Sequence, residues 1–585
     1  MTRKLSIELF QANAHVGHLR FNLARVFDAL ETSQADLVVF PECFLTGYPL
    51  QDLVLRPGFL AEVDAALDEL AQFIRNRGGP ALLIGAPIAG ADLPHNAAVL
   101  FRPDGSRQTA IKIELPNNDV FDERRTFARG SHATPLTLDG WKIGALICED
   151  MWHGPVAREL ADEGADFLLV INGSPMEIGK QQIRVDHARR RVASTRLPLI
   201  YANLVGGQDE LVFDGASFAL STDGELVMQQ PFEEIRVTLE LTKDDQGKAA
   251  LSASKAQGFG FKNALRVFPP VVPYPEKLES IYRTVTMGLR DYVEKNRFHD
   301  VLFGLSGGLD SAVVAAIGAD ALGGKRVSCL MLPAEWTGEE SVSLADDMAQ
   351  RLDCNYGTVP VKTVTDALEA LLEAGLAVLP PASDPTGKAR QVAAENIQAR
   401  ARGNLIMALS NARPGTLVLS TGNKSEMSVG YATLYGDMCG GFNPIKDLYK
   451  TLVQDIAKWR NSLTQDDLKR LELLGVVNPI PEGIITRPPT AELAPGQTDE
   501  NSLGAYPVLD TVLECLIERM LSPPAAARTA SQLLGETVGV DYVERIARLV
   551  KFAEYKRRQA PPGIKVTGRS FGFGWRYPIT NAAGL

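Results

Sequence analysis

The sequence is poor in the features that mark secreted, membrane-spanning or zinc-binding proteins. Its 585 residues include only 6 cysteines, and none lies in a CxxC pair or at the spacing of a zinc site, so neither a disulfide framework nor a structural zinc is expected. No apolar run is long enough to span a bilayer, and MTRKLSIELFQANAH breaks into polar residues too early for a signal peptide. We therefore expect a cytoplasmic protein with no membrane partner.

The chain also lacks an excess of basic residues. It has 60 Lys and Arg residues against 71 Asp and Glu residues, for a formal net charge of -11, which argues against a nucleic-acid partner. A hydrophobic content of 45% and a charged content of 22% are typical of a globular protein. A chain of 585 residues is too long for one hydrophobic core, so two or more domains are expected.

The first half alternates short apolar runs with amphipathic stretches. The apolar runs, bounded by polar, Gly or Pro residues, predict strands over residues 4–10, 36–42, 81–87, 141–150, 166–172 and 198–205. Residues 18–34 carry apolar side chains at helical spacing. The stretches QADLVVFPE and GADFLLVINGS both run from Ala-Asp into a buried strand, which hints at two similar layers packed face to face.

Composition divides the chain near residue 250. Residues 251–275 are rich in Gly, Pro and aromatic residues, and we interpret them as a linker or arm between domains over 1–250 and 276–585. The second domain shows predicted strands over 301–305, 326–332 and 416–421, and predicted helices over 312–322 and 395–413. This alternation predicts a doubly wound parallel sheet, whose ligands bind at the carboxyl ends of the strands.

A glycine loop follows the first strand of the second domain but lacks the lysine of a P-loop. In GLSGGLDSAVV, residues 304–314, the glycines permit a tight turn, and Asp310 and Ser311 open a helix whose N–H groups point at an anion. A turn with an Asp cap would explain SGG alone. The whole string S-G-G-x-D-S favours phosphate binding, and it resembles the PP-loop of the ATP pyrophosphatase superfamily, which holds the pyrophosphate that leaves when AMP is transferred.

That resemblance implies a set of ATP-binding residues along the loop and after the strand over 416–421. They are Gly304, Leu305, Ser306, Gly307, Gly308, Leu309, Asp310, Ser311 and Thr421. A further string, STGNKSEMSVGYATLYGDMCGGFNPIKDLYKT over residues 420–451, resembles the signature of the NAD synthetases. It implies that Glu426 acts with Asp310 on Mg²⁺ and phosphate, and that Lys450 neutralises phosphate charge.

Three other segments are similar to the same family. ENIQARARGNLIMALSN and EYKRRQAPPGIKVTGRSFG imply that Asn396 and Lys556 join Glu426 and Lys450 in binding deamido-NAD⁺. Residues 487–510 resemble a flexible loop over the site. Six other polar residues of the first two segments have a plainer interpretation as solvated surface side chains; they are Gln398, Arg400, Arg402, Arg557, Arg558 and Lys565.

Three chemically different residues stand at strand ends or beside them in the first half. Glu42 closes DLVVFPE, Lys112 lies in AIKIELPN and Cys148 lies in WKIGALICED. Each alone has an ordinary explanation, as a turn residue, a solvated lysine or a core cysteine. Together they supply a base, a positive charge and a nucleophile, and strand-end placement suits convergence at one site.

The set resembles the nitrilase or carbon–nitrogen hydrolase superfamily, through F-P-E, K-x-x-L-P and C-E-D in that order. The resemblance implies that Glu42 is the general base and that Cys148 is the nucleophile that forms a thioester. It implies that Lys112 stabilises the oxyanion together with the backbone N–H after Cys148. We also expect the charge of Lys112 to lower the pKa of Cys148.

Four more residues enter through the same resemblance. Glu123, in VFDERRTF, matches a second acid that orients the lysine and the substrate. Ser174 and Lys180, in INGSPMEIGK, match positions that grip glutamine. Asn118 stands at a glutamine-binding position where many such amidases carry Tyr.

The two resemblances combine into a glutamine-dependent member of the NAD synthetase family. They imply an α/β chain with an N-terminal four-layer α-β-β-α sandwich of nitrilase type and a C-terminal doubly wound parallel-sheet PP-loop domain, similar to adenine nucleotide alpha hydrolases. The implied reaction adenylates deamido-NAD⁺ with ATP and Mg²⁺ and amidates it with ammonia released from glutamine. Its products are NAD⁺, AMP, pyrophosphate and glutamate. A homo-oligomer and an ammonia tunnel are implied as well.

Two alternatives remain open from the sequence. One is a different PP-loop ligase, such as a guanylate- or asparagine-forming synthetase, although the string over residues 420–451 is not typical of those enzymes. The other is a nitrilase-type amidase with a nucleotide-sensing domain. The presence of Ser306, Asp310 and Glu426 argues against a sensor, because a sensor has no need of Mg²⁺ ligands.

Overall fold

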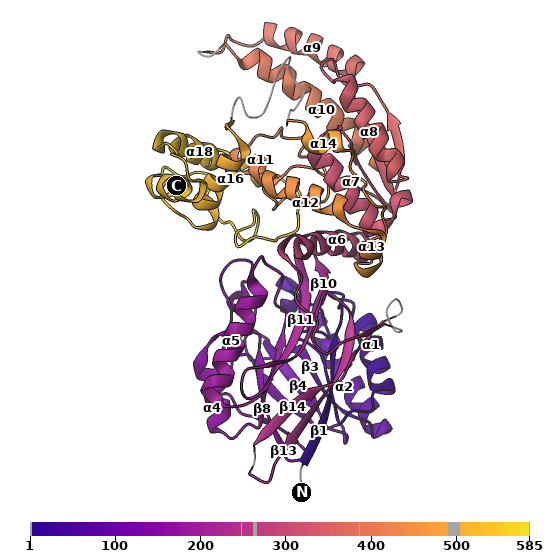
Figure 1. Ribbon diagram of the computed structural model, residues 1–585, viewed down its shortest axis with the longest axis vertical. Coiled ribbons are helices and arrows are strands. Elements are labelled where there is room, and N and C mark those ends of the chain that lie inside the picture. The colour runs from indigo at the N-terminus through magenta and orange to yellow at the C-terminus, as the bar shows by residue number, and fades with distance from the viewer. Residues whose placement is uncertain (1–2, 247, 261–265, 385–386, 489–502, 584–585) are drawn as a thin grey trace. The chain divides into compact units, whose positions relative to one another are not determined.

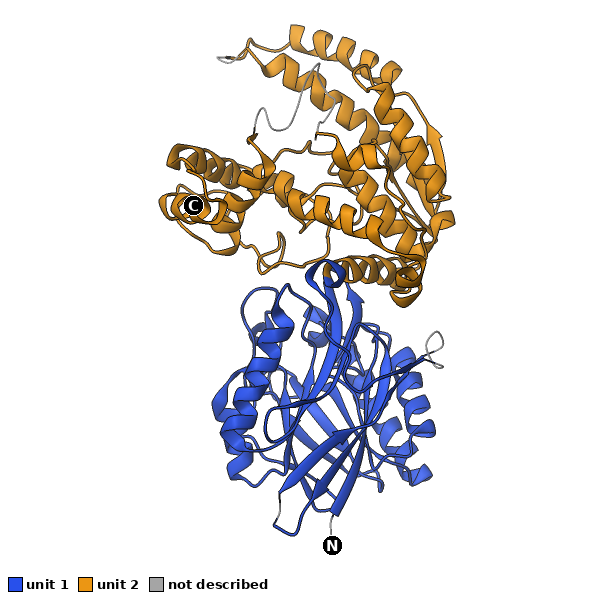
Figure 2. Ribbon diagram, viewed as in Figure 1, with its two compact units in different colours: residues 1–280 blue, residues 281–585 orange. Residues whose placement is uncertain are grey.

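A computed structural model describes the chain except for residues 1–2, 247, 261–265, 385–386, 489–502 and 584–585. The chain divides into two compact units, residues 1–280 and 281–585 (Figure 2). In the part of the chain that is described, no helix combines the length and apolarity needed to cross a membrane.

The first unit contains two sheets (Figure 1). One has the order β16-β15-β13-β1-β2-β3-β4-β5, with β14 also paired to β13; the other has the order β10-β11-β9-β8-β7-β6, with β12 paired to β11. The first comprises β1 (Arg3–Gln11), β2 (Leu37–Val39), β3 (Ala81–Ile88), β4 (His95–Phe101), β5 (Arg107–Ile111), β13 (Ile235–Lys243), β14 (Ala249–Ala253), β15 (Ala256–Gly258) and β16 (Val267–Phe268). The second comprises β6 (Leu136–Leu138), β7 (Trp141–Ile147), β8 (Phe167–Asn172), β9 (Leu199–Asn203), β10 (Val205–Gln208), β11 (Leu211–Leu220) and β12 (Leu226–Pro231).

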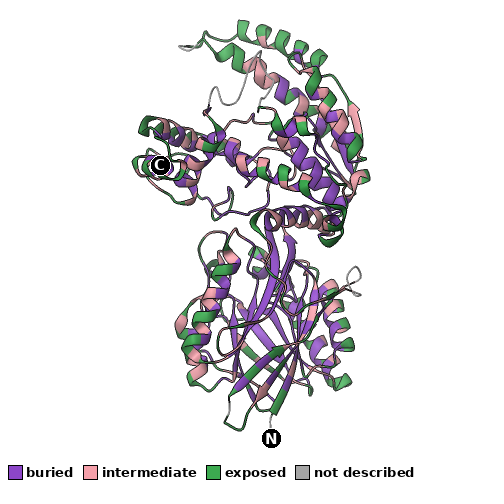
Figure 3. Ribbon diagram, in the orientation of Figure 1, coloured by how far each residue is buried: buried purple, intermediate pink, exposed green. Residues whose placement is uncertain are grey.

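Three apolar clusters lie between the layers of this unit and show which layers pack against each other. One joins the first sheet to α1 (Leu19–Thr32) and α2 (Pro57–Arg77). A second lies between the sheets, where Val39 of β2 shares a cluster with Leu169 of β8. A third joins the second sheet to α4 (Gly154–Asp162) and α5 (Lys180–Thr195). The predicted α-β-β-α sandwich is confirmed, and most of its strand residues are buried (Figure 3) because both faces of each sheet are covered.

The repeated Ala-Asp-strand pattern has the same local structure in both sheets. Asp36 precedes β2 and accepts the backbone N–H of Ser6 in β1 at 2.7 Å. Asp166 precedes β8 and accepts the N–H of Lys142 in β7 at 2.9 Å. In each case the two strands are parallel neighbours, so the aspartate that precedes one strand binds the main chain of the adjacent strand. The echo in the sequence therefore corresponds to one structural device that occurs in both sheets.

The Gly- and Pro-rich segment after residue 250 contributes strands to the first unit. β15 pairs with β13, and β16 pairs with β15, both antiparallel. Both strands are very short, as expected where Gly and Pro interrupt pairing. Residues 269–276 then lead to α6 (Lys277–Lys295), within which the division between the two units falls.

The second unit contains a parallel four-stranded sheet of order β19-β18-β17-β20. Its strands are β17 (Asp300–Gly304), β18 (Val327–Met331), β19 (Asn355–Thr358) and β20 (Thr416–Val418). The order reverses between β17 and β20, so the doubly wound prediction is confirmed and places the ligand crevice at the carboxyl ends of these strands. The helices are α7 (Leu309–Leu322), α8 (Glu339–Arg351), α9 (Lys362–Ala377), α10 (Ala389–Ala412), α11 (Lys424–Val429), α12 (Lys450–Ser462), α13 (Gln465–Arg470), α14 (Glu482–Thr486), α16 (Tyr506–Leu513), α17 (Pro523–Leu534), α18 (Val540–Phe552) and α19 (Glu554–Arg557).

Helix α7, which begins at the glycine loop, is buried on all sides from Ser311 to Leu322. An all-apolar helix of this kind belongs in a core, and its one buried carboxylate, Asp320, is fully paired. Arg460 of α12 donates to Asp320 at 2.6 and 2.8 Å, and Tyr282 of α6 donates to it at 2.5 Å. These contacts tie α6 and α12 to the helix that carries the loop.

Candidate active sites

A buried charged cluster links three of the predicted amidase residues. Glu42 follows β2, Lys112 follows β5, and Glu123 begins a short 3₁₀ helix, η2 (Glu123–Arg125). Lys112 Nζ lies 2.6 Å from Glu42 Oε1 and 2.8 Å from Glu123 Oε2. Glu42 and Lys112 are both 0% exposed. Charged groups so deeply buried need partners of opposite sign, and here one ammonium serves two carboxylates.

Cys148 occupies a sharp turn between β7 and the four-residue helix α3 (Glu149–Trp152). Its φ of 47° and ψ of −97° form a conformation that non-glycine residues rarely adopt. Strained backbone of this kind is concentrated at functional sites, and a nucleophile at a strand-to-helix turn is a recurrent hydrolase arrangement. The Cys148 N–H donates to the carbonyl of Ile171 at the end of β8, at 2.9 Å.

The carboxyl ends of the two sheets meet at this site. Gly173, directly after β8, donates its N–H to Glu42 Oε2 at 2.7 Å, although Glu42 belongs to the other sheet. Glu42 raises the pKa of Cys148 and Lys112 lowers it, so the charges of both residues act on the thiol. The structure thus brings Glu42, Lys112, Glu123 and Cys148 together.

The electrostatics of Cys148 test the predicted effect of Lys112 on the thiol. Burial raises the pKa of the thiol well above its usual value, and the carboxylate of Glu42 raises it further. Lys112 does lower the pKa, as expected, but it does not outweigh these two effects. The predicted effect of Lys112 is therefore confirmed, but desolvation of the thiolate, which could not be read from the sequence, dominates the net pKa of Cys148. The thiol is protonated at neutral pH and requires a base.

Burial and ion pairing have opposing effects on the pKa values of Lys112 and Glu123. Burial alone would lower the pKa of Lys112, but the carboxylates of Glu123 and Glu42 raise it well above its usual value. Burial raises the pKa of Glu123, and Lys112 opposes that effect. Lys112 is therefore a permanent positive charge at this site, which is what stabilisation of an oxyanion requires.

Two buried polar residues of the cluster were not predicted. Asn96 of β4 donates to Glu42 Oε1 at 2.7 Å and to Glu123 Oε1 at 3.4 Å. Tyr48 donates its hydroxyl to Glu123 Oε1 at 2.8 Å. The signal in the sequence was the single Asn in the otherwise apolar strand NAAVLF, since a polar residue at a buried strand position needs a partner.

A glycine makes room for the Glu42 turn. A Cβ on Gly85 of β3 would lie 2.2 Å from the backbone nitrogen of Cys43 and 2.6 Å from Glu42 Cα. Any side chain at this position would therefore displace the general-base candidate.

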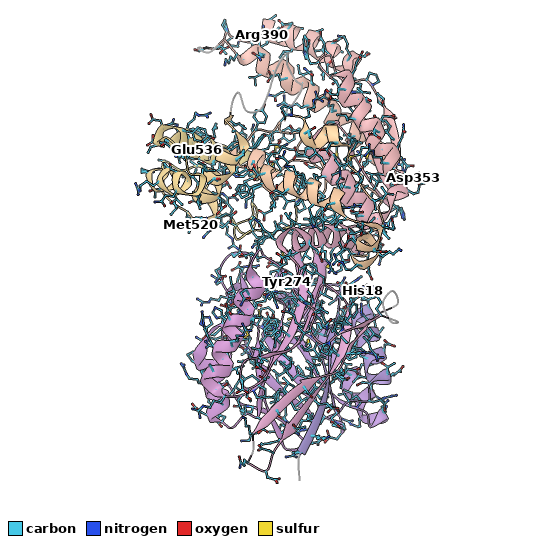
Figure 4. The ribbon with its side chains drawn as sticks, in the orientation of Figure 1. His18, Tyr274, Asp353, Arg390, Met520 and Glu536 are labelled. Carbon is cyan, nitrogen blue, oxygen red and sulfur yellow. The ribbon has the colours of Figure 1, made fainter. Side chains whose placement is uncertain are left out.

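The predicted glutamine-binding residues occupy different environments. Ser174, directly after Gly173, accepts a hydrogen bond at 3.0 Å from Arg184 Nε, and Arg184 also pairs with Asp214 at 2.9 Å. Tyr274, labelled in Figure 4, donates to Asp214 at 2.8 Å and closes this buried network. Ser174 is therefore rigidly held.

The other two glutamine-binding candidates are less enclosed. Lys180 begins α5 and lies 3.7 Å from Glu177. Asn118 is exposed, on the loop between Lys112 and Glu123. That loop leads from one catalytic candidate to the other, which places Asn118 beside the site in sequence but gives it no buried contact.

The glycine loop of the second unit has the geometry of a phosphate-binding turn. It spans the residues between β17 and α7, and Gly307 has a φ of +78°, where a Cβ would lie 2.3 Å from the carbonyl oxygen of Ser341. Ser306 and Ser311 hydroxyls lie 3.1 Å apart, and the Gly308 N–H donates to Ser306 Oγ at 3.2 Å. The loop opens α7 at the carboxyl end of β17, next to β20.

Acidic and basic candidates converge beside that loop. Lys450, the first residue of α12, is hydrogen-bonded to Asp310, and its Nζ lies 3.8 Å from Glu426 Oε1. Asn423 caps α11 in a capping box with Glu426 and donates to Asp310 Oδ1 at 3.2 Å. Thr421 lies on the same segment, between β20 and α11. Asp310, Glu426, Lys450 and Thr421 thus surround the carboxyl ends of β17 and β20.

The donor set fits Mg²⁺ rather than a metal held by protein alone. Among the described residues, no group of three or more His, Cys, Asp or Glu side chains is placed to hold an ion. Asp310 and Glu426 offer two carboxylates on either side of one ammonium. Mg²⁺ commonly uses one or two carboxylates and completes its shell with water and substrate phosphates.

Asn396 and Lys556 contact one segment, residues 430–433, from two directions. Thr433 donates to Asn396 Oδ1 at 2.8 Å, and Lys556 donates to the carbonyls of Gly430 and Ala432 at 2.8 and 2.7 Å. Burial lowers the pKa of Lys556. Asn396 of α10 and Lys556 of α19 thus both contact the loop that follows α11.

Three residues interpreted as solvated surface side chains are buried instead. Gln398 is 6% exposed, Arg557 6% and Lys565 2%. Arg557 donates to the carbonyl of Ser428 at 2.7 Å, and Lys565 donates to that of Thr567 at 2.7 Å. The charged groups of Arg557 and Lys565 thus bind main-chain carbonyls of the protein itself. The sequence does not show whether such a group binds the protein or water.

The predicted flexible loop over 487–510 falls mostly on residues 489–502, outside the described residues. Its described end belongs to α16, where Asp510 accepts from Ser425 Oγ at 2.5 Å and from Thr451 N–H at 2.9 Å.

Comparisons with known proteins match both halves. A family model described as carbon–nitrogen hydrolase covers residues 8–243, and one described as NAD synthase covers residues 281–560. The chain is 42% identical over 585 residues to a glutamine-dependent NAD(+) synthetase of Rhodobacter capsulatus, with 99% of each chain covered. It is 40% identical over 599 residues to that of Thermotoga maritima, again with 99% of each covered.

A solved structure agrees. The glutamine-dependent NAD⁺ synthetase of Acinetobacter baumannii in complex with ADP superposes with a TM-score of 0.72 and 35% identity, covering 99% of this chain and 98% of that chain. The fold and sites therefore define an amidase fused to a PP-loop ligase. The chain belongs to the glutamine-dependent NAD(+) synthetases. It is thus an enzyme, a ligase that uses glutamine, and the two alternatives are not supported.

Proposed function

We propose that the first unit releases ammonia from glutamine by thioester chemistry. Cys148 attacks the carboxamide carbon while Glu42 takes the thiol proton, a step that the raised pKa of Cys148 makes necessary. Lys112 and the backbone N–H after Cys148 stabilise the oxyanion. Glu42 returns the proton to the departing ammonia and then activates the water that hydrolyses the thioester.

The remaining residues of this unit orient the reaction. Glu123 holds Lys112 in place through the 2.8 Å ion pair. Ser174, fixed by Arg184, and Lys180 are positioned to bind the amino acid end of glutamine. Asn118 offers an amide donor and acceptor to glutamine at a position where many such amidases carry a tyrosine.

In the second unit, the loop from Gly304 to Ser311 cradles ATP phosphates, with Thr421 beside it. Lys450 offsets the charge of the leaving pyrophosphate, and Asp310 and Glu426 would hold Mg²⁺, which neutralises phosphate charge when bound. Deamido-NAD⁺ binds along Asn396, Glu426, Lys450 and Lys556. AMP is transferred to its carboxylate, and ammonia then displaces AMP to give NAD⁺.

One observation carries the proposal: a single chain holds a buried Glu42–Lys112–Cys148 set and a separate PP-loop site with paired carboxylates. An amidase and an adenylating ligase have a joint purpose if the ammonia of the first is the nucleophile of the second. Because ammonia is mostly ammonium at neutral pH, we propose that it passes between the sites through the protein.

The decisive experiment is Cys148→Ala, assayed with glutamine and, separately, with an ammonium salt. NAD⁺ formation from glutamine should disappear, whereas formation from ammonium should persist together with AMP and pyrophosphate. Cys354→Ala, at a cysteine that directly precedes β19 and so lies away from the carboxyl ends of the strands of the second unit, is the control and should keep both reactions. Loss of the ammonium reaction in Cys148→Ala would refute the division of labour.

We further propose that the enzyme is a cytoplasmic homo-oligomer. Helix α9 supports self-association, because Leu371 is 67% exposed and Val364 is 50% exposed on a helix whose only buried described residue is Thr365 (Figure 3). Apolar side chains in such numbers favour a protein contact over water. Light scattering coupled to size-exclusion chromatography should give a mass of at least twice the chain mass of 63.4 kDa. A mass equal to that of one chain would contradict self-association.

A further inference from the structure

We infer that Asp150, the last residue of the C-E-D string, is a positioning residue that fixes Lys112 relative to the Cys148 turn. The inference deepens the proposed glutaminase function and rests on it. Asp150 is 2% exposed, and its carboxylate is aimed at the main chain.

Asp150 joins two segments that carry different catalytic groups. Its Oδ1 accepts the backbone N–H groups of Ile113 at 3.0 Å and Glu114 at 2.7 Å. Both residues directly follow Lys112. Its Oδ2 accepts the N–H of Ile147 at 3.0 Å, and Ile147 directly precedes Cys148. One carboxylate therefore bridges the two strand ends from which the oxyanion stabiliser and the nucleophile project.

The bridge also spans the strained turn itself. Ile147 and Asp150 lie on either side of Cys148, whose φ of 47° is unfavourable for a residue with a side chain. Such a conformation persists only when the surrounding structure over-determines it. The Cys148 N–H bond to Ile171 holds one side of the turn, and the Asp150–Ile147 bond closes it.

The chemistry calls for a carboxylate and not merely a polar side chain. Three N–H donors approach both oxygens, and only an ionised carboxylate accepts on both. Burial raises the pKa of Asp150 to about 6, with the three main-chain donors opposing that effect, so the group is ionised at pH 8. An asparagine would keep one acceptor and place an NH₂ group against a main-chain N–H.

The test compares Asp150→Asn with Asp166→Asn in the full-length enzyme at pH 8. Asp166 is a matched control because its carboxylate also accepts a main-chain N–H of β7, from Lys142 at 2.9 Å, but at the opposite end of that strand. Three quantities are measured for each variant: kcat and KM for glutamine hydrolysis, the rate of NAD⁺ formation from ammonium chloride, and the thermal unfolding transition.

For Asp150→Asn we expect kcat for glutamine to fall about 10- to 100-fold, because small misplacements of catalytic groups have effects of that size. KM for glutamine should stay within about threefold, and the ammonium reaction should stay within about twofold. Asp166→Asn should retain kcat within about twofold of the wild type.

The outcomes separate the inference from the function it rests on. If wild-type enzyme fails to release glutamate from glutamine, the proposed function is wrong. If the wild type is active and Asp150→Asn matches Asp166→Asn in kcat, the positioning role is wrong. A collapse of the unfolding transition, or equal losses in the glutamine and ammonium reactions, would assign Asp150 to folding and also overturn the inference.

Discussion

Lys112 allows two carboxylates to be buried within a few ångströms of each other. Glu42 and Glu123 would repel each other without it, and a lone carboxylate in such a site would take up a proton. The ammonium is fully buried and bonded to both. The residue proposed to stabilise the oxyanion thus also compensates the charge of both carboxylates.

Replacement of Lys112 by Met should therefore remove activity and stability together. We expect glutamine hydrolysis to fall at least about 100-fold, the size of effect seen when one oxyanion donor is lost. The free energy of unfolding of the first unit should fall by about 3–5 kcal/mol, because the substitution removes one partner of a buried ion pair. Urea unfolding and glutamate release measure the two effects.

The double variant Lys112→Met with Glu123→Gln distinguishes these roles. It removes one uncompensated carboxylate, so it should recover part of the stability but none of the hydrolysis. NAD⁺ formation from ammonium should remain in both variants. Recovery of hydrolysis in the double variant would show that Lys112 serves only to balance charge.

Helix α11 is the element that positions the acidic end of the ligase site. It begins at Asn423 in a capping box and carries Glu426 in its first turn. Its first residue, Lys424, is 0% exposed and donates to Glu518 at 2.5 Å and to Thr567 at 2.6 Å, and lies 2.8 Å from Asp447. A six-residue helix is too short to be stable by itself, so this anchor holds Glu426 in place.

We predict that Lys424→Met lowers NAD⁺ formation from both nitrogen sources and leaves glutamine hydrolysis detectable. The second unit should be destabilised by about 3–5 kcal/mol at pH 7, because Asp447 and Glu518 lose their partner. Lys458→Met, on the exposed face of α12, is the matched control and should change neither rate nor stability.

The difference in stability between the wild type and Lys424→Met should depend on pH. Burial alone would raise the pKa of Asp447, but Lys424 brings it below the unfolded value of 3.8. A carboxyl group with a lowered pKa stabilises the fold above that value and loses its contribution as pH falls through the folded pKa. The difference in free energy of unfolding between wild type and Lys424→Met should thus narrow as the pH falls below about 3.8 in urea titrations. A gap that widens with acid would contradict the ion-pair explanation.

The whole molecule consists of two compact units (Figure 2), and we propose that each carries one of the two reactions. Each unit has its own core and its own site, so a substitution in one should leave the chemistry of the other measurable. Asp310→Asn should abolish NAD⁺ formation from glutamine and from ammonium, since Asp310 contacts both Lys450 and Asn423 in the ligase site. Some glutamine hydrolysis should remain.

A mixture of the Asp310→Asn and Cys148→Ala enzymes tests internal transfer of ammonia. At pH 7 the mixture should form NAD⁺ from glutamine much more slowly than wild type, because ammonia released to solution becomes ammonium. The rate should rise with pH as free ammonia increases. A mixture as fast as wild type at pH 7 would exclude transfer within the protein.

The sequence by itself determined the fold class, the family and the residue types of both sites, because apolar periodicity and short motifs are local properties. It could not give the net pKa of Cys148, the burial of Arg557 and Lys565, or the contributions of Asn96 and Asp150. Those depend on groups far apart in the chain, such as Gly173 against Glu42, or Asp150 against Ile113. Desolvation and hydrogen-bond partners exist only after strands from both sheets meet, so the tertiary structure alone decided which charges are paired and which thiol needs a base.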